Sequence, residues 1–389
     1  MAFSQTMFIE INEDIIKDAI EKKDLPANTT KDLLIQMALC AKQGKHIVSV
    51  PCFLKSKAYC KSISELIGKS YFSALDYYNR KRSEYGRILS HLSVRGFITY
   101  EDKSDLPNNF IRIIPNKHSN FEPWVEAHVL TENLMDSSFY IYLAYYYFNV
   151  EILGGRKRRF DFCYKFYPLM GGGVTIEKVL HGEIKREQHF CLALADSDKK
   201  WDGDTNVGDT AQKMLDLMKN ENPFNCKLYV MSKVREIENL IPRKFVEKFG
   251  DKTGFIDIFN YNPSFYDMKI GLSLTELFHN KVCKYWKDMF NAPALFIERN
   301  NIRQRSQSKK DYDKAVKGME PLKKGFGSSL LSLVVGDIDY EKDLKKYNPK
   351  MQDGLYHVIP SELTVEQREE WKNIGREIFS WTCCLKAKI

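Results

Sequence analysis

Carboxylate side chains follow three of the apolar stretches that read as strands in this sequence. Glu132 comes directly after the first stretch, and Asp136 stands four residues further on, one helical turn away. Asp196 and Asp198 follow the second stretch, and Glu238 follows the third. Because ligands bind at the carboxyl ends of parallel strands, where these acids would meet, we expect them to form one site.

Acids gathered in this way need a cation. Two carboxylates about 4 Å apart repel each other by roughly 4 kcal/mol at an effective dielectric constant of ~20. A hard divalent ion reverses the sign of that energy, and Mg²⁺ prefers oxygen ligands. Such an ion can bind a phosphate oxygen, activate water and stabilise a leaving oxygen. Strand-end acids without cysteine or histidine partners therefore indicate phosphoryl-transfer chemistry.

The region that must position these acids, residues 117–245, alternates strand-like and helix-like stretches. This alternation predicts an α/β fold with a mostly parallel sheet and helices on both faces. The stretch 190–195 is apolar throughout, as expected for a central strand covered on both sides. The predicted strands are 125–130, 162–169, 190–195 and 226–231, and helices are predicted over 136–148, after Gly173 and over 209–218.

The region before it, residues 1–116, predicts a winged helix-turn-helix-like domain. Asn28 can cap a helix, and the stretches 97–100 and 110–114 read as two strands joined by a polar turn, which predicts a β-hairpin. Helices followed by a hairpin are typical of winged helices. Such a domain could bind nucleic acid or protein, and the sequence favours neither.

The region after it, residues 246–389, predicts a mostly helical domain. Thr364 and Gln367 can form a capping box at the start of the last helix. The apolar face of that helix predicts a packing surface rather than a ligand site, and it carries Trp371, Ile374, Ile378 and Trp381.

Composition is that of a soluble globular chain. The sequence has 389 residues, of which 43% are hydrophobic and 28% charged, enough for two or three domains. We find no apolar stretch of the ~18–20 residues that a membrane span needs, and no secretory signal. The nine cysteines form no Cys-x-x-Cys pair, so we expect reduced thiols in a cytoplasmic protein.

The formal net charge of +8 mildly favours a polyanionic partner. The positive charge is concentrated in runs, including a segment over 303–324. A run of this kind is either a solvated loop or a set of phosphate contacts. The candidate nucleic-acid contacts are Arg156, Lys157, Arg158 and Arg159 in one run and Lys199 and Lys200 beside the acidic pair.

Four pieces of the sequence together resemble the Toprim family. They are VLTENLMD, MGGGVTI, FCLALADSDKK and REIENLIP, and they occur in the Toprim order. The last piece is most similar to the Toprim of the overcoming-lysogenisation-defect nucleases and of the nuclease effector in the PARIS anti-phage system. The resemblance implies a Rossmann-like Toprim core and a Mg²⁺-dependent nuclease.

The resemblance also implies roles for the acids. Carried to this sequence, it makes Glu132 the catalytic acid/base and a metal ligand, with Asp136 orienting the site. Asp196 and Asp198 become the principal ligands of Mg²⁺ or Mn²⁺, bound as one or two ions, and Glu238 serves a second ion.

Two positions qualify this assignment. The family has a glycine after the first glutamate, where this sequence has Asn133. We expect the larger side chain to narrow the space through which a phosphate approaches the site. Glu236 lies in the same turn as Glu238, and either could be the late ligand.

The resemblance implies a bacterial anti-phage or toxin effector that cleaves DNA or RNA. Gly68-Lys69-Ser70 lacks the first glycine of a P-loop, because position 63 is isoleucine, so we expect any ATPase or sensor partner to act in trans. A second copy of the chain is a further candidate partner. One alternative is a nucleic-acid-binding or partner-sensing module with a structural acid cluster. The other is a different Toprim nucleotidyl-transfer enzyme, disfavoured because no zinc-ribbon cysteines are present.

Overall fold

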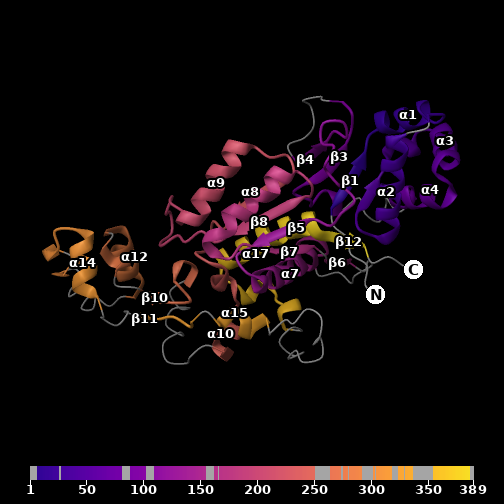
Figure 1. The fold of residues 1–389 in the computed structure, drawn as a ribbon. Helices are drawn as coiled ribbons and strands as arrows, with labels where there is room; N and C mark the ends of the chain where they lie inside the picture. Colours follow the sequence, from indigo (N-terminus) through magenta and orange to yellow (C-terminus); the bar gives the residue numbers. More distant parts are fainter. Residues whose placement is uncertain are drawn as a thin grey trace. The chain divides into compact units, whose positions relative to one another are not determined.

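The structure is a computed structural model, and two compact units make up the chain (Figure 1). The first unit comprises Met1–Leu194, Lys213–Tyr229 and Lys372–Ile389, and the second comprises Ala195–Gln212 and Val230–Trp371. The division of the sequence into three domains stays a prediction. The described residues are 7–25, 28–80, 88–101, 109–154, 162–164, 166–249, 263–272, 275–278, 280–290, 301–302, 304–317, 323–327, 329–335 and 354–385.

The first unit contains a four-stranded sheet near the N-terminus, with strand order β2-β1-β3-β4. Each neighbouring pair in this sheet is parallel. As predicted, Asn28 caps a helix, because its side chain accepts a hydrogen bond from the backbone N–H of Lys31. The elements are β1 (Phe8–Ile11), α1 (Glu13–Glu21), α2 (Thr29–Gln43), β2 (Ile47–Ser49), η1 (Pro51–Leu54), α3 (Lys57–Ile67), α4 (Lys69–Leu75), α5 (Tyr77–Arg80), β3 (Arg95–Ile98) and β4 (Phe110–Ile113).

This sheet corrects the prediction for residues 1–116. The expected hairpin is wrong, because β3 and β4 pair in parallel, with Gly96 opposite Ile111 and Ile98 opposite Ile113. A winged helix needs an antiparallel wing, so that expectation is wrong as well. The physical reason lies in β1 and β2, two short strands that the sequence did not predict. Strands β1 and β2 pair in parallel, β3 then pairs in parallel with β1, and β4 with β3. Without β1 and β2, we would expect β3 and β4 to form an antiparallel hairpin.

The first unit also contains the predicted α/β core, a second four-stranded sheet with order β7-β5-β8-β9. Strand β5 pairs in parallel with both β7 and β8. All residues of β8 are buried, which confirms the predicted central strand. Helices α8 and α7 lie on opposite sides of the sheet (Figure 1). The elements are β5 (His128–Thr131), α7 (Leu134–Tyr147), η2 (Phe148–Ile152), β7 (Tyr167–Met170), η3 (Gly173–Thr175), α8 (Ile176–Arg186), β8 (Cys191–Ala195), α9 (Asp209–Glu221) and β9 (Cys226–Val230).

The two sheets share one topology. In each, the first strand along the chain lies between the second and the third, so the connections reverse direction beside it. Open parallel sheets bind ligands in the crevice at such a reversal, outside the carboxyl ends of the strands. The topology therefore predicts two such crevices, one after β5 and β8 and one after β1 and β3.

The last long helix, α17 (Val365–Thr382), begins at the predicted capping box. The backbone N–H of Gln367 donates to the Thr364 hydroxyl, and the backbone N–H of Thr364 donates to the Gln367 side chain. The apolar face is buried as predicted, including Trp371 and Trp381. After α17, β12 (Cys383–Leu385) pairs antiparallel with β6 (Phe162–Tyr164).

The described part of the second unit contains several helices and the two-stranded pair of β10 and β11, while the mostly helical domain over residues 246–389 stays a prediction. The five cysteines whose side chains are described are all free thiols, and four of them are buried. Among the described residues, no helix is long and apolar enough to span a membrane. The elements of this unit are η4 (Ile237–Leu240), α10 (Arg243–Phe249), η5 (Pro263–Phe265), β10 (Gly271–Leu272), η6 (Glu276–Phe278), α12 (Asn280–Phe290), α14 (Lys309–Val316), β11 (Lys323–Lys324), α15 (Leu330–Val335) and η7 (Pro360–Glu362).

Candidate metal centre

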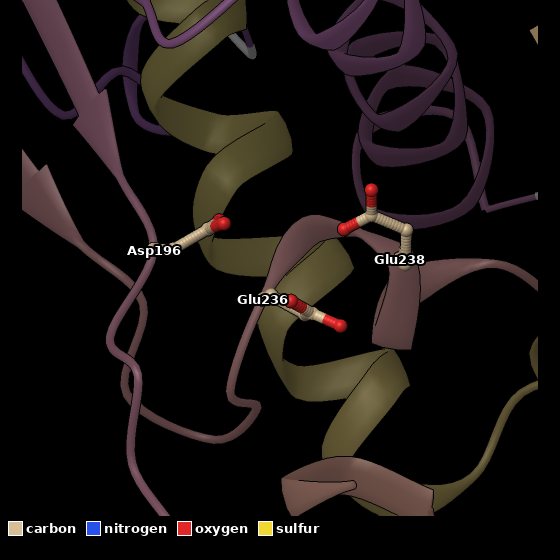
Figure 2. A group of neighbouring side chains, drawn as sticks. All are labelled: Asp196, Glu236 and Glu238. Atoms are coloured by element: carbon tan, nitrogen blue, oxygen red, sulfur yellow. The ribbon is translucent and has the colours of Figure 1, made fainter. Parts of the chain in front are cut away.

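Three carboxylates converge in the second unit: those of Asp196, Glu236 and Glu238, here called the acid cluster (Figure 2). Each offers one oxygen, and these oxygens lie within 4.8 Å of one another. Asp196 directly follows β8, while Glu236 and Glu238 lie in the turn after β9. The structure thus brings together two of the predicted ligands and adds Glu236, the residue considered as the alternative to Glu238.

Hydrogen bonds join the two loops that carry the cluster. An Asp196 carboxylate oxygen accepts from the backbone N–H of Ile237 at 3.0 Å. The backbone N–H groups of Ser197 and Asp198 both donate to the carbonyl of Arg235, at 3.0 and 2.9 Å. These bonds hold the residues after β8 against the residues after β9, so the position of Asp196 relative to the two glutamates is set by backbone.

Glu236 forms hydrogen bonds that stabilise the local fold, in addition to its place in the acid cluster. Its backbone N–H donates to the Asn239 side chain at 2.8 Å at the start of the short helix η4, and its Oε1 accepts from the buried backbone N–H of Met268 at 2.6 Å. Burial first, and then the negative charge of Glu238, raise the pKa of Glu236 to about 8. A bound cation would oppose that shift, because it favours the ionised carboxylate.

Glu238 is buried and has a cation beside it. The Nζ of Lys269 lies 3.2 Å from Oε2 of Glu238 and 3.6 Å from Oε2 of Glu236. Burial lowers the pKa of Lys269, but the charges of Glu238, Glu236 and Asp196 outweigh it and raise the pKa above its ordinary value. One ammonium group thus faces three carboxylates. No sequence motif pointed to this lysine, which stands outside the four family-like pieces.

The neighbouring ion network fixes the turn that carries Lys269. The Arg235 guanidinium donates to Asp267 and to Glu276, both at 2.9 Å. Asp267 in turn accepts from the backbone N–H groups of Lys269 and Ile270. Arg235 therefore serves the site twice, through its carbonyl on the loop after β8 and through its side chain on the turn at residues 267–270.

Asp198, predicted as a principal ligand, is not in the cluster. Its side chain is exposed, and its backbone adopts a left-handed φ of 53°. It packs so closely on Gly208 that a Cβ at position 208 would overlap its carboxylate. The ligand role of Asp198 stays a prediction that this arrangement does not support.

Glu132 and Asp136 belong to the first unit, and neither is part of the acid cluster. Glu132 follows β5 and is exposed, and its Oε1 would lie 3.4 Å from a Cβ at position 173, where glycine has a φ of 58°. Asp136 is buried and accepts from the backbone N–H of Asn133, closing the capping box of α7. Its observed contact therefore fixes the turn that carries Glu132, and the catalytic roles of both acids stay predictions.

Two of the predicted nucleic-acid contacts, Lys199 and Lys200, lie in the described part of the second unit and contact other residues of that unit. Lys199 donates to the carbonyl of Ser232 at 3.3 Å, and the Nζ of Lys200 lies 3.8 Å from Glu276. The basic run of Arg156, Lys157, Arg158 and Arg159 lies outside the described residues.

Comparisons with protein-family models, with curated proteins and with solved structures find nothing that matches this chain. Its chemistry must therefore be inferred from the residues themselves. The donor set consists of carboxylate oxygens, which suits a hard cation such as Mg²⁺ or Mn²⁺ rather than a thiophilic metal. Oxygens on opposite sides of one Mg²⁺ stand about 4 Å apart, so the spacing in the cluster fits a shared ion.

Proposed function

We propose that this chain is a nuclease that depends on a divalent cation and hydrolyses phosphodiester bonds of DNA or RNA at the acid cluster. The observation that carries the proposal is the convergence of Asp196, Glu236 and Glu238 from two strand-end loops. Because carboxylates repel one another at this spacing, a sequence that buries two of the three is best explained by a cation that binds there.

Each acid has a distinct task in this proposal. Asp196 and Glu238 hold the ion. Glu236 has one oxygen committed to the backbone of Met268, so it chiefly positions the turn and lends its other oxygen to the cluster. A divalent cation held there supplies Lewis-acid stabilisation of the charge that develops on phosphate oxygens.

Glu132 is proposed as the acid/base that handles the proton of the attacking water. Support comes from its place directly after β5, the neighbour of β8 in the sheet, and from the family-like order of the motifs. Asp136 and Asn133 hold the turn that carries it. The same resemblance supports a Toprim core and a cytoplasmic anti-phage or toxin effector, activated by an ATPase or sensor protein in trans.

The test combines metal binding with cleavage. Full-length protein is incubated with plasmid, single-stranded DNA and tRNA, with Mg²⁺, Mn²⁺ or EDTA, and bound Mn²⁺ is counted by electron paramagnetic resonance. We expect Asp196→Asn to lose Mn²⁺ binding and to reduce cleavage by about 100-fold or more, since even residues that only support metal ligands cost 10–100-fold. Glu132→Gln should reduce cleavage by about 100-fold as the loss of a general acid/base.

Asp202→Asn is the matched control, because Asp202 is an exposed aspartate in the same unit and is not part of the cluster. It should keep both metal binding and cleavage. Cleavage that survives Asp196→Asn and Glu132→Gln unchanged would contradict the proposal. Mn²⁺ binding without cleavage would instead indicate that an activating partner is missing, because the metal site is tested independently of turnover.

A second candidate function is favoured by Lys269. Its ammonium already offsets part of the cluster's charge, so the acids could be a structural ion network in a nucleic-acid-binding or partner-sensing module. In that case neither Mn²⁺ nor Mg²⁺ would bind at the cluster, and EDTA would leave the thermal stability unchanged.

A further inference from the structure

The sheet near the N-terminus carries a second crevice of the kind that binds ligands in parallel α/β folds. It lies outside the carboxyl ends of β1 and β3, where the strand order reverses. The two strand ends are joined there by Asp14, whose Oδ2 accepts from the Thr99 hydroxyl at 2.6 Å and from the backbone N–H of Tyr100 at 2.8 Å. The floor of this crevice is therefore fixed by hydrogen bonds.

A pocket of about 340 Å³ opens at this position. Its volume lies near the lower end of the range for small-molecule sites, about 300–1,000 Å³. The lining comes from α1 and the residue that ends it, from one residue after β3, and from the residues after β4: Asp18, Lys22, Tyr100, Ile114, Asn116 and Lys117.

One wall of the pocket is a chain of hydrogen bonds and ion pairs. Lys22 contacts Asp18 at 2.7 Å, and the Thr30 hydroxyl donates to Asp18 at 2.5 Å. The same hydroxyl lies 2.7 Å from the Tyr100 hydroxyl. These contacts hold the Tyr100 ring and the Lys22 ammonium in place before any ligand arrives, which lowers the entropy that binding must overcome.

The other wall leaves positive charge available. Lys117 is exposed and forms no ion pair with the residues that the structure describes. Lys22 is paired with Asp18, and the Asp14 carboxylate beneath Tyr100 already accepts hydrogen bonds from Thr99 and Tyr100, so Lys117 is the ammonium group of the lining that an anion can bind. The ring of Tyr100 and the side chain of Ile114 supply apolar surface against which a flat ring can pack.

We propose that this pocket binds a mononucleotide, with the phosphate at Lys117 and the base against Tyr100 and Ile114. The combination of a cationic side, a positioned aromatic ring and a volume of about 340 Å³ fits this class of ligand. The site is separate from the acid cluster, which lies in the other unit, and its occupancy does not depend on nuclease activity.

The test is calorimetric titration of the full-length protein with AMP, GMP and CMP in buffer with EDTA, alongside adenosine and inorganic phosphate as partial ligands. We expect at least one mononucleotide to bind at micromolar to millimolar concentration, about tenfold or more tighter than either partial ligand. Lys117→Glu should weaken that binding at least about tenfold, because it places a carboxylate where the phosphate lies.

Lys23→Glu is the matched control, since Lys23 is exposed, neighbours Lys22 and is not part of the lining. It should keep the wild-type affinity, as should Asp196→Asn. Tyr100→Leu should weaken the mononucleotides while leaving the affinity for inorganic phosphate unchanged. The proposal is overturned by three results: no mononucleotide binding at millimolar concentration, phosphate alone binding as tightly as AMP, or equal affinity in Lys117→Glu and wild type.

Discussion

Lys269 and Glu238 form the closest ion pair of the acid cluster, with 3.2 Å between Nζ and Oε2. Only about a third of the Lys269 side chain is exposed, and only 4% of the Glu238 side chain is exposed. The raised pKa of Glu236 favours its protonated form at neutral pH, but the one ammonium group still faces the two carboxylates of Asp196 and Glu238, so the cluster retains an excess of negative charge near its own counter-ion. This relationship makes the charge state of the cluster the property to test first.

Lys269→Met should make the second unit depend on a divalent cation. Removing the ammonium leaves the carboxylates without their counter-ion, which should lower the free energy of unfolding in EDTA by roughly 1–3 kcal/mol, below the cost for a fully buried pair. Mg²⁺ should then raise the melting temperature more in the variant than in wild type. Lys233→Met is the control, because its ion pair with Glu369 is on the surface, and it should change both values little.

Glu236→Ala and Glu238→Ala should separate the structural acid from the ligand. In EDTA, Glu236→Ala should lower the free energy of unfolding by about 1–3 kcal/mol, because the buried N–H of Met268 loses its acceptor. Glu238→Ala should cost less, since it also removes repulsion within the cluster. Both variants should lose the stabilisation by Mg²⁺. Chemical unfolding with and without Mg²⁺ measures this, and a larger cost for Glu238→Ala in EDTA would reverse the assignment.

The sequence predicted those parts of the site that depend on strand ends. Asp196 directly follows β8 and Glu238 lies in the turn after β9, so the rule for parallel sheets was enough to bring them together. The same rule could not exclude Asp198 from the metal site. The side chain of Asp198 is placed by a left-handed turn and by its contact with Gly208, and both exist only in the folded loop. Lys269 carried no signal, since its position depends on the Arg235–Asp267 ion pair.

The fold, too, has parts that the sequence predicted and parts that it did not. Stretches with a clear apolar signal, namely the continuous apolar run of β8 and the one-sided apolar face of α17, were predicted well because their own sequence determines both type and burial. The pairing of β3 with β4 was predicted wrongly because strand direction is not a local property. It follows from β1 and β2, two short strands of four and three residues that give little periodic signal.

Glu183 predicts an acid-sensitive contribution to the stability of the first unit. Burial raises the pKa of this carboxyl, but the hydrogen bond from His128 at 2.7 Å and the charges of His128 and Arg186 outweigh it, so its pKa lies below the ordinary value. A carboxyl with a lowered pKa stabilises the fold at pH values above its unfolded pKa, and that contribution disappears as the pH falls through the folded value. Glu183→Gln should therefore lower the free energy of unfolding by about 1.5–3 kcal/mol at neutral pH.

The difference between Glu183→Gln and wild type should shrink when the pH is lowered from neutral to below the ordinary glutamate pKa, as measured by urea unfolding at each pH. Glu177→Gln, on the same helix, is the control, because Glu177 forms no ion pair with the residues that the structure describes. A gap that is the same at neutral and acid pH would show that the ion pair is not its source.

Gly208→Ala should destabilise the second unit through Asp198. The new Cβ would overlap the carboxylate and Cβ of Asp198, so the loop after β8 must move, and overpacking of this kind costs about 1–3 kcal/mol. Asp198→Gly removes those atoms and suits the left-handed backbone, so the double variant should recover most of the loss. A double-mutant cycle measured by chemical unfolding should give a coupling energy of about 1 kcal/mol or more.

Gly182→Ala is the matched control for that cycle, because Gly182 lies within α8 and a Cβ there would meet no atom within 4 Å. It should stabilise the protein by about 0.5–1 kcal/mol, the ordinary gain of alanine over glycine in a helix. If Gly208→Ala behaves like Gly182→Ala, the loop is not held against Gly208. If it destabilises the chain and also weakens Mn²⁺ binding, the same movement displaces Asp196, two residues before Asp198, and the loop after β8 is then a determinant of the metal site.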